Sequence, residues 1–369
     1  MEITANRENF LKALYWAQST VERRNTMPIL ANVMIESRGK NIRITATDLE
    51  IGVRAKLEGE ILHEGMVTLN AKKLYEIVRE AAEREAIHLR RLENDWVEIK
   101  SGKSVFKVVG LDAREFPSFP DFTSESLASV SAKVLKEMID KTVFSVSTDE
   151  SRSSLNGVFL EEISGGKLRM VATDGHRLAF IEREVGSLKL EKGVILPRKG
   201  LSELGKLLED MEDGVISIGF KDNLGLVVRD NVELFMRLIE SDYPDYGKVI
   251  PKENPYRVSV EQRGLLQALR RVSILSSDRY KGVKVEFRQG RMTISANNPD
   301  LGEAMEEVEV EYNGKPLTIG FNARYLIDVL GVLNDGIAVG VELKDELSPS
   351  VVREDGDDGY LYVIMPMRL

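Results

Sequence analysis

The segment VATDGHRLAF, from Val171 to Phe180, places a carboxylate and an imidazole two residues apart, at Asp174 and His176. An aspartate that orients a histidine can make the imidazole a general base for a hydroxyl nucleophile. Such a site also needs a nucleophile, a substrate cleft and usually a third orienting group. Asp174 and His176 are therefore a candidate hydrolase pair, and the alternative is a structural or binding role for the same turn.

Two sister copies of this segment, TATDLEIGV and ISANNPDLGEA, lack the histidine. The positions of Asp174 and His176 are occupied by Asp48 and Glu50 in the first copy. Asn298 and Asp300 occupy them in the third. Only one copy carries the histidine, but an enzyme could use one copy alone, so the repeat does not by itself exclude a catalytic pair.

The copies recur at a nearly constant period. Asp48 and Asp174 are 126 residues apart, and Asp174 and Asn298 are 124 apart. A second marker agrees, because the first valines of NVMIE, GVFLE and GVKVE follow one another at intervals of 125 residues. Two independent markers with one period indicate a chain built from three homologous units.

Each unit is predicted to contain two amphipathic helices among short alternating strands. In the first unit, Phe10, Leu11, Leu14 and Ala17 follow helical spacing. The strands are separated by turns rich in glycine, lysine and asparagine. The predicted helices are 7–18, 71–84, 131–145, 197–210, 261–275 and 321–333.

These elements predict an α+β chain of three homologous domains, each with two helices packed on antiparallel sheets. Segments that contain proline and serine follow the final strands of the first two units. We expect the domains to span residues 1–124, 125–254 and 255–369.

Composition excludes several classes of site. The chain has no cysteine, so disulfides, thiol nucleophiles and cysteine-ligated metals are ruled out. Three histidines are too few for a histidine-rich metal site. SGKS at Ser101 lacks the first glycine of a phosphate loop, because that position is Val97. No cofactor is expected, and without a basic leader or an apolar run of 18 residues we expect a cytoplasmic protein with no membrane partner.

The net charge of −9 argues at first against nucleic acid, because binding phosphate needs lysine and arginine. The six predicted helices, however, carry 16 basic and 11 acidic residues, a net charge of +5, which leaves −14 on the rest of the chain. Helices that share one surface would make it positive on an acidic protein. The alternative is that lysine and arginine are simply good helix formers on solvated faces.

The whole sequence resembles the bacterial sliding clamp family, the β subunits of DNA polymerase III. The resemblance is carried in order by TATDLEIGV, SLNGVFLE, VATDGHRLA, PRKG, YPDYGKVIP, ILSSDRYKGVKV, ANNPDLGEAMEE, IGFNARYLIDVL and YVIMPMRL. It implies a non-catalytic processivity factor in which two chains join head to tail in a ring, with helices lining the hole and sheets outside. Its implied partners are encircled duplex DNA, the replicative polymerase, the clamp loader and repair proteins, at the nucleoid.

Simple geometry also favours two chains. Helices about 9 Å apart and about 11 Å thick leave a hole of roughly 23 Å when twelve stand in a circle, but only about 6 Å when there are six. Duplex DNA is roughly 20 Å across. A ring would let an acidic protein hold DNA with modest inner charge, because enclosure replaces tight phosphate contacts.

The resemblance implies three sets of site residues, each with a structural alternative. DNA contacts are expected at Arg24, Lys72, Lys73, Arg152, Arg198, Lys199, Lys248, Arg279 and Lys281, which could equally be solvated charges. The chain departs from the family at Ser153 and Ser154, where an aromatic pair is frequent, and this puts the local DNA contact in doubt.

A partner-peptide pocket is the second set. It is expected at Leu155, Thr173, Gly175, His176, Arg177, Leu178, Pro244, Val249, Val363, Met365, Pro366, Met367 and Arg368. Flexible methionines suit a site that accepts many partners. The alternatives are a buried terminal strand for VIMPMRL and a core position for Leu155.

The third set is the dimer interface. It is expected at Lys73, Lys103, Phe106, Ile274, Leu275, Glu303, Glu306 and Glu307, where opposite charges surround an apolar centre. The alternatives are ordinary surface acids and core leucines. Two other functions compete with the clamp: a hydrolase that uses Asp174 and His176, and a peptide-binding scaffold with no role on DNA.

Overall fold

The computed structural model describes residues 1–21, 27–119, 127–163, 166–186, 188, 190–211, 213–277 and 281–368. Arg24 and Arg279, two of the expected DNA contacts, lie outside these ranges. Across the described ranges, no helix is long and apolar enough to cross a membrane.

The first repeat runs through a strand, a helix, a group of strands, a second helix and three more strands. Its elements are β1 (Glu2–Asn6), α1 (Arg7–Thr20), β2 (Asn32–Arg38), β3 (Asn41–Thr47), β4 (Ile51–Leu57), β5 (Gly59–His63), β6 (Gly65–Asn70), α2 (Ala71–Glu80), β7 (Ala86–Arg91), β8 (Trp96–Ser101) and β9 (Ser104–Val109).

The second and third repeats follow the same order, and the residues that the structure describes in them contain no counterpart of β5. The second contains β10 (Ala128–Ser131), α3 (Ala132–Asp140), β11 (Gly157–Ile163), β12 (Lys167–Thr173), β13 (Arg177–Glu184), β14 (Val194–Pro197), α4 (Arg198–Leu208), β15 (Val215–Lys221), β16 (Leu224–Arg229) and β17 (Val232–Arg237). The third contains β18 (Tyr256–Glu261), α5 (Gln262–Val272), β19 (Gly282–Arg288), β20 (Arg291–Asn298), β21 (Gly302–Glu309), β22 (Leu317–Asn322), α6 (Ala323–Leu330), β23 (Ala338–Leu343), β24 (Ser350–Glu354) and β25 (Tyr360–Ile364). The predicted threefold repeat and the presence of six helices are confirmed, but several helices end earlier than predicted: α2 ends at Glu80 rather than at residue 84, and α3 ends at Asp140 rather than at residue 145.

Side-chain caps fix where several helices begin. The Asn6 side chain accepts hydrogen bonds from the backbone N–H groups of Glu8 and Asn9 at the start of α1. Asn70 and Asn322 cap α2 and α6 in the same way, at corresponding places in the first and third repeats. Each asparagine ends a strand and starts a helix, so one residue type sets the strand-to-helix junction in both repeats.

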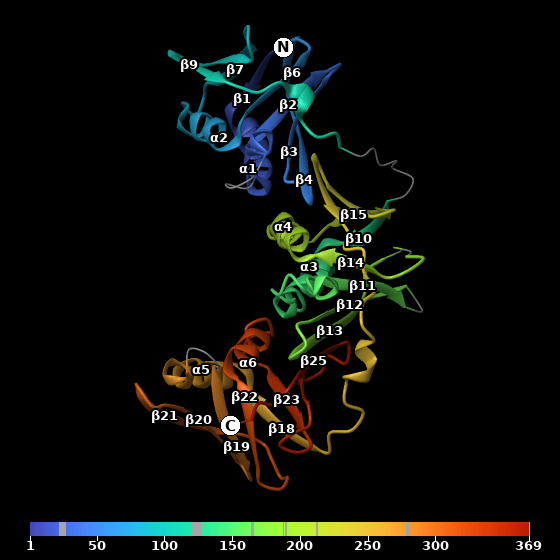
Figure 1. Cartoon of the computed structure of the whole chain (residues 1–369), viewed down its shortest axis with the longest axis vertical. Helices are drawn as coiled ribbons and strands as arrows, with labels where there is room; N and C mark the ends of the chain where they lie inside the picture. The colour runs from blue at the N-terminus through green and yellow to red at the C-terminus, as the bar shows by residue number, and fades with distance from the viewer. Residues whose placement is uncertain are drawn as a thin grey trace. The chain divides into compact units, whose positions relative to one another are not determined.

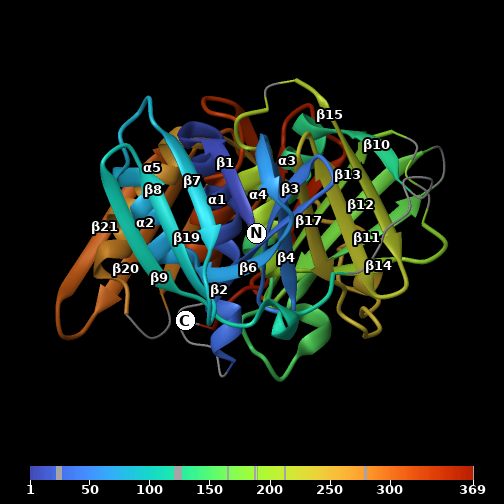
Figure 2. The ribbon, with the colours of Figure 1, turned by 90° about the horizontal axis from the view of Figure 1, so that it is seen from above.

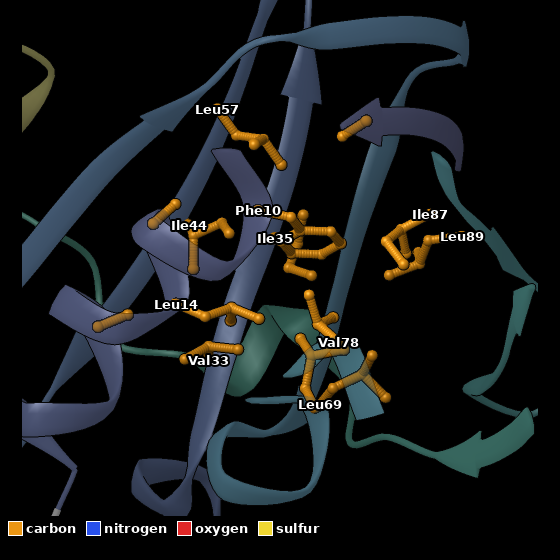
Figure 3. Close-up of a cluster of buried hydrophobic side chains, with 14 of the residues drawn as sticks. Phe10, Leu14, Val33, Ile35, Ile44, Leu57, Leu69, Val78, Ile87 and Leu89 are labelled. Carbon is orange, nitrogen blue, oxygen red and sulfur yellow. The ribbon is translucent and has the colours of Figure 1, made fainter. Parts of the chain in front are cut away.

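The core of the first repeat forms where α1 and α2 lie against the sheets. Figure 3 shows Phe10 and Leu14 of α1 among Val33, Ile35 and Ile44 of the neighbouring strands. Each of these side chains is fully buried or nearly so. Burying one such side chain contributes about 1.5–3 kcal/mol, so the core rather than helix propensity holds α1 in place.

Neighbouring repeats share sheets. One eight-stranded sheet has the order β10-β15-β16-β17-β4-β3-β2-β6, and β17 of the second repeat pairs antiparallel with β4 of the first. A second sheet has the order β14-β11-β12-β13-β25-β24-β23-β18, and there β25 of the third repeat pairs with β13 of the second. The remaining sheets, β5-β1-β7-β8-β9 and β21-β20-β19-β22, each lie within one repeat.

Because sheets are shared in this way, the chain divides into two compact units, and the division falls inside the second repeat. The first unit comprises residues 1–132 and 199–238, and the second comprises residues 133–198 and 239–369. In the first unit, α1 and α2 lie next to each other beside the strands of the first repeat (Figure 1). Figure 2 shows β7, β8 and β9 side by side in the five-stranded sheet, with β9 at its edge.

Candidate functional site

The turn between β12 and β13 is held by the side chains of Thr173 and Asp174. The Asp174 carboxylate accepts hydrogen bonds from the backbone N–H groups of His176 (2.9 Å) and Arg177 (3.1 Å). The Thr173 hydroxyl donates to the Arg177 carbonyl (2.6 Å) and accepts from the N–H of Gly175 (3.1 Å). Asp174 therefore builds a turn.

The turn between β3 and β4 repeats these four contacts. Asp48 accepts from the N–H groups of Glu50 and Ile51, and Thr47 donates to the Ile51 carbonyl and accepts from Leu49. The threonine-aspartate pattern that marks the sequence period thus supplies the hydrogen bonds that hold a hairpin turn. A catalytic role for Asp174 and His176 has no support in this geometry, because the carboxylate is used by the turn and the exposed imidazole lies against Tyr325 with ring centroids 6.5 Å apart.

Arg177 joins this turn to α6. Its guanidinium is buried, with the side chain 8% exposed, and pairs with Asp174 (3.1 Å) and Asp328 (2.6 Å). It also donates to the Phe144 carbonyl and lies over the Tyr325 ring. Burial alone would lower the pKa of Arg177, but the surrounding acidic and tyrosine oxygens raise it, so the guanidinium is a permanently charged link within the second unit.

Beside this turn the second unit contains a mostly apolar pocket of about 160 Å³. Four segments supply its walls: the short helical turn that ends at Leu155, the turn between β12 and β13, the chain after β17, and β25 with the residue that follows it. Its lining residues are Leu155, Thr173, Gly175, Arg177, Leu178, Pro244, Asp245, Tyr246, Val249, Val363 and Met365. A concave apolar site with few polar groups suits a short peptide or small ligand.

Tyr246 holds one wall of the pocket in place. Its hydroxyl donates to Glu161 and accepts from Arg169 (2.7 Å), while Arg169 also pairs with Glu182 (2.5 Å). Burial, together with the bond to Glu161, raises the pKa of Tyr246 to about 12, so the hydroxyl stays protonated at neutral pH. Tyr246 thus fixes the chain that follows the second repeat against the β11-β12-β13 surface.

Nine of the thirteen predicted pocket residues line this one pocket. His176, Pro366, Met367 and Arg368 do not: the carbonyl of His176 accepts from the Met365 N–H (2.9 Å), and the Met367 N–H donates to the Gly320 carbonyl (2.8 Å). The chain past Met365 therefore leaves the pocket and joins β22. Sequence reasoning missed Asp245 and Tyr246, although the repeated aromatic-Pro-Asp-aromatic segments FPDF and YPDY were a usable signal.

Family models match the chain three times. The N-terminal, central and C-terminal domain models of the DNA polymerase III β subunit match residues 1–120, 129–245 and 247–368. The chain belongs to the DNA polymerase III β subunit family, the sliding clamps.

Whole-length relatives agree with this assignment. The chain is 37% identical to the β sliding clamp of Pseudomonas aeruginosa and 36% identical to that of Vibrio cholerae, with 100% of each chain covered. A crystal structure of the Bartonella birtlesii sliding clamp bound to griselimycin matches with a TM-score of 0.95 at 36% identity, and one from Pseudomonas aeruginosa with a TM-score of 0.94 at 36% identity. Both cover 100% of this chain and of the matched chain. The three clamp domains and the non-catalytic clamp class predicted from sequence are thereby confirmed.

The described basic residues that are expected to contact DNA differ in their exposure and in their ion pairs. Lys72 and Lys73 are exposed on α2, and Arg198 is exposed at the start of α4. Lys199 is half-buried and ion-paired with Asp48, so its charge is largely neutralised within the first unit. In the second unit, Arg152 and Lys248 are exposed but pair with Asp149 (3.4 Å) and Asp245 (3.1 Å), and Lys281 is half-buried.

Sequence reasoning missed further exposed cations on the clamp's helices. Each of these side chains lacks a hydrogen bond or ion pair to another described residue. They are Lys12 on α1, Lys133 on α3, Arg270 on α5 and Arg324 on α6. Together with Lys72 on α2 and Arg198 on α4, they give every one of the six described helices an exposed basic residue.

The expected interface residues lie at or beside two sheet edges. Lys103 and Phe106 are exposed at β9 and the turn before it, and Lys73 is exposed on α2. Glu303 and Glu307 are exposed on β21, whereas Glu306 is half-buried and held by Arg271 (2.9 Å). Ile274 is exposed and Leu275 half-buried just after α5.

Proposed function

We propose that two copies of this clamp join head to tail into a ring that encloses duplex DNA. The observation that carries the proposal is a rule of strand pairing. The strand just after the shared turn pairs with the last strand of the next repeat, as β4 does with β17 and β13 with β25. β21 holds this position in the third repeat, and β9 is the last strand of the first, yet each lies at the edge of its sheet, with no further strand beside it in the described part of the chain. If β21 of one copy paired with β9 of the other, the strand after the shared turn would pair with the last strand of the next repeat in all three repeats.

The composition of these edges supports this pairing. β9 exposes Val105, Phe106 and Val109, which are 54%, 39% and 58% exposed, and β21 exposes Met305, which is 71% exposed. Unpaired edge strands with apolar side chains are templates for another strand. Lys103 beside β9 and Glu303 on β21 add opposite charges, which suits a heterologous contact that closes into a ring.

Exposed lysines and arginines on all six described helices support contact with DNA phosphates. Such contacts carry no sequence preference, so enclosure rather than affinity would retain the ring while it slides. The candidate contacts remain Lys72, Lys73, Arg152, Arg198, Lys199, Lys248 and Lys281, to which Lys12, Lys133, Arg270 and Arg324 are added. Ion pairs within the chain weaken the case for Lys199, Arg152 and Lys248.

The pocket beside Gly175 is proposed to dock short peptide segments of the replicative polymerase, the clamp loader and repair proteins. Its polar lining is small, and the Met365 thioether can adapt to different side chains. The site of action would be the cytoplasm, at the nucleoid. Domain boundaries near residues 124 and 254 are proposed with it. The first is supported by the family-model matches, which end at 120 and resume at 129, whereas the second lies seven residues past the start of the C-terminal match at 247.

Solution mass tests the ring. We expect a mass of twice 41.4 kDa by light scattering, and Phe106→Glu is expected to shift the protein to one chain because it places a charge in the apolar contact. Val215→Glu is the matched control, because Val215 is an apolar strand residue that is 69% exposed and its strand, β15, belongs to a different sheet from β9 and from β21. A wild-type mass of 41.4 kDa, or equal loss of mass in both variants, would contradict the proposed interface.

A further inference from the structure

The first unit contains a second groove, of about 300 Å³, beside the turn between β3 and β4. Like the pocket, it is walled by a turn, by the chain after the last strand of a repeat and by a paired strand, and Leu224 of β16 completes the lining. Its lining residues are Thr47, Leu49, Glu50, Ile51, Gly52, Pro117, Ser118, Phe119, Leu224, Phe235, Met236 and Arg237.

The groove and the pocket are built by the same parts of consecutive repeats. Gly52 lies opposite Phe235 in the β4–β17 pairing, as Leu178 lies opposite Val363 in the β13–β25 pairing. Phe119 is the first residue of the FPDF segment, and the last three residues of the corresponding YPDY segment, Pro244, Asp245 and Tyr246, line the pocket. The groove is therefore a repeat-related version of the pocket.

Leu49, at the rim of the groove, has a strained backbone conformation. Its φ is +79°, in the left-handed region that Gly175 occupies (φ +89°) at the corresponding position of the other turn. A leucine side chain is disfavoured there, and at 47% exposed it gains little from burial. The turn uses this backbone conformation, since the Leu49 N–H donates to Thr47, but it does not need a leucine side chain. Backbone strain of this kind occurs at binding sites, and here it holds an apolar side chain at the groove's rim.

The groove differs from the pocket in charge. By strand register, Arg237 takes the place that Met365 has in the pocket. Its side chain is exposed and makes no hydrogen bond or ion pair within the described ranges. Met236 and Phe119 supply the apolar surface, and the Phe119 ring lies over Gly52, where a side chain would collide with it. A free guanidinium beside an apolar groove complements a carboxylate next to a large apolar side chain.

We infer that this groove is a second docking site, for peptide segments in which a carboxylate follows a large apolar side chain. The inference rests on the proposed function for its class of ligand, the peptide segments of clamp partners. It does not depend on the ring or on DNA. One chain would then hold two segments at once, and the groove would be selective for the acidic one.

Methionine methyl groups distinguish the two sites. In protein labelled with carbon-13 at the methionine methyls, Met236 reports on the groove and Met365 on the pocket, and Met236→Leu and Met365→Leu assign the two signals. The probe is the capped peptide Gly-Leu-Phe-Asp-Gly, compared with the same peptide carrying Asn for Asp. We expect saturable shifts of Met236 with the Asp peptide and affinity weaker by about tenfold with the Asn peptide, the loss expected for one charged contact.

Two variants test the residues that define the groove. Arg237→Gln is expected to abolish the difference between the Asp and Asn peptides at Met236. Leu49→Gly keeps the turn, because glycine adopts its backbone conformation, and is expected to weaken binding at Met236 while leaving Met365 unaffected. If Met365 shifts but Met236 does not, the groove is overturned while the pocket stands. If the Met236 signal shifts but the Met365 signal does not, the proposed pocket fails and the groove stands. If neither signal shifts, both proposals are overturned.

Discussion

The backbone N–H of Met365 donates to the carbonyl of His176 across 2.9 Å. This bond ties the chain at the end of β25 to the turn that begins β13. His176 therefore contributes to the pocket through its backbone, while its exposed ring lies against Tyr325. The neighbouring carboxylate of Asp174 shapes the turn itself.

Replacing His176 should leave the stability of the protein almost unchanged, whereas replacing Asp174 should lower it. His176→Ala keeps the backbone bond, so we expect the free energy of unfolding to change by less than about 0.5 kcal/mol, with peptide affinity unchanged. Asp174→Ala removes two backbone hydrogen bonds and the ion pair to Arg177, and should cost about 1–3 kcal/mol. Urea unfolding of both variants measures this difference. A larger loss for His176→Ala than for Asp174→Ala would refute the structural role of the carboxylate.

Acid should destabilise the second unit through a cluster of ion pairs. Lys141, which is 5% exposed, pairs with Glu137, Glu354 and Asp357, and Arg183 pairs with Glu137 and Asp357. Burial alone would raise the pKa of the Glu137 and Asp357 carboxyls, but the hydrogen bonds and charges of Arg183 and Lys141 lower it. Because these pKa values are depressed on folding, the stabilisation is complete above the ordinary values of 4.5 and 3.8 and is lost as the pH falls below them.

A pair of adjacent aspartates tests this acid dependence. Asp357→Asn should lower the free energy of unfolding at neutral pH by about 1–3 kcal/mol and reduce its further loss on acidification to about pH 3. Asp358→Asn is the control, because Asp358 is exposed and makes no ion pair with any residue that the structure describes. Equal acid profiles for Asp357→Asn and the wild type would show that the cluster does not set the dependence.

Gly52 and Phe119 should be energetically coupled. A Cβ on Gly52 would lie 2.3 Å from the Phe119 ring. Gly52→Ala is therefore expected to destabilise the protein by about 1–3 kcal/mol in the wild type, but by less in a Phe119→Ala background. Urea unfolding of the two single variants and the double variant completes the cycle. Additive losses would mean that the ring does not rest on this glycine.

Local sequence patterns predicted the helices, but they could not predict which distant strands pair with each other. The helical spacing of Phe10 and Leu14 and the threonine-aspartate turn at Asp174 each depend on residues a few positions apart, so the sequence displays them directly. The pairing of β13 with β25 depends on contacts almost two hundred residues apart, and its register has no local signature. The eight-stranded sheets shared between repeats were therefore found only in the structure.

The pocket was predicted only in part, because some of its contacts also join residues that lie far apart in the sequence. Family resemblance located the turn at Gly175 and the strand at Val363, but it could not tell which side of the chain past Met365 faces the cavity. Tyr246 was missed because its role depends on Glu161 and Arg169, which lie far away in sequence.

Retention on DNA of different topology tests the enclosing ring most directly. The protein is loaded by a bacterial clamp loader onto nicked circular duplex DNA, and the amount bound is measured before and after a single cut makes the DNA linear. We predict stable retention on the circle and rapid loss once free ends exist, because phosphate contacts alone are weak and sequence-independent. Equal retention on circular and linear DNA would contradict enclosure.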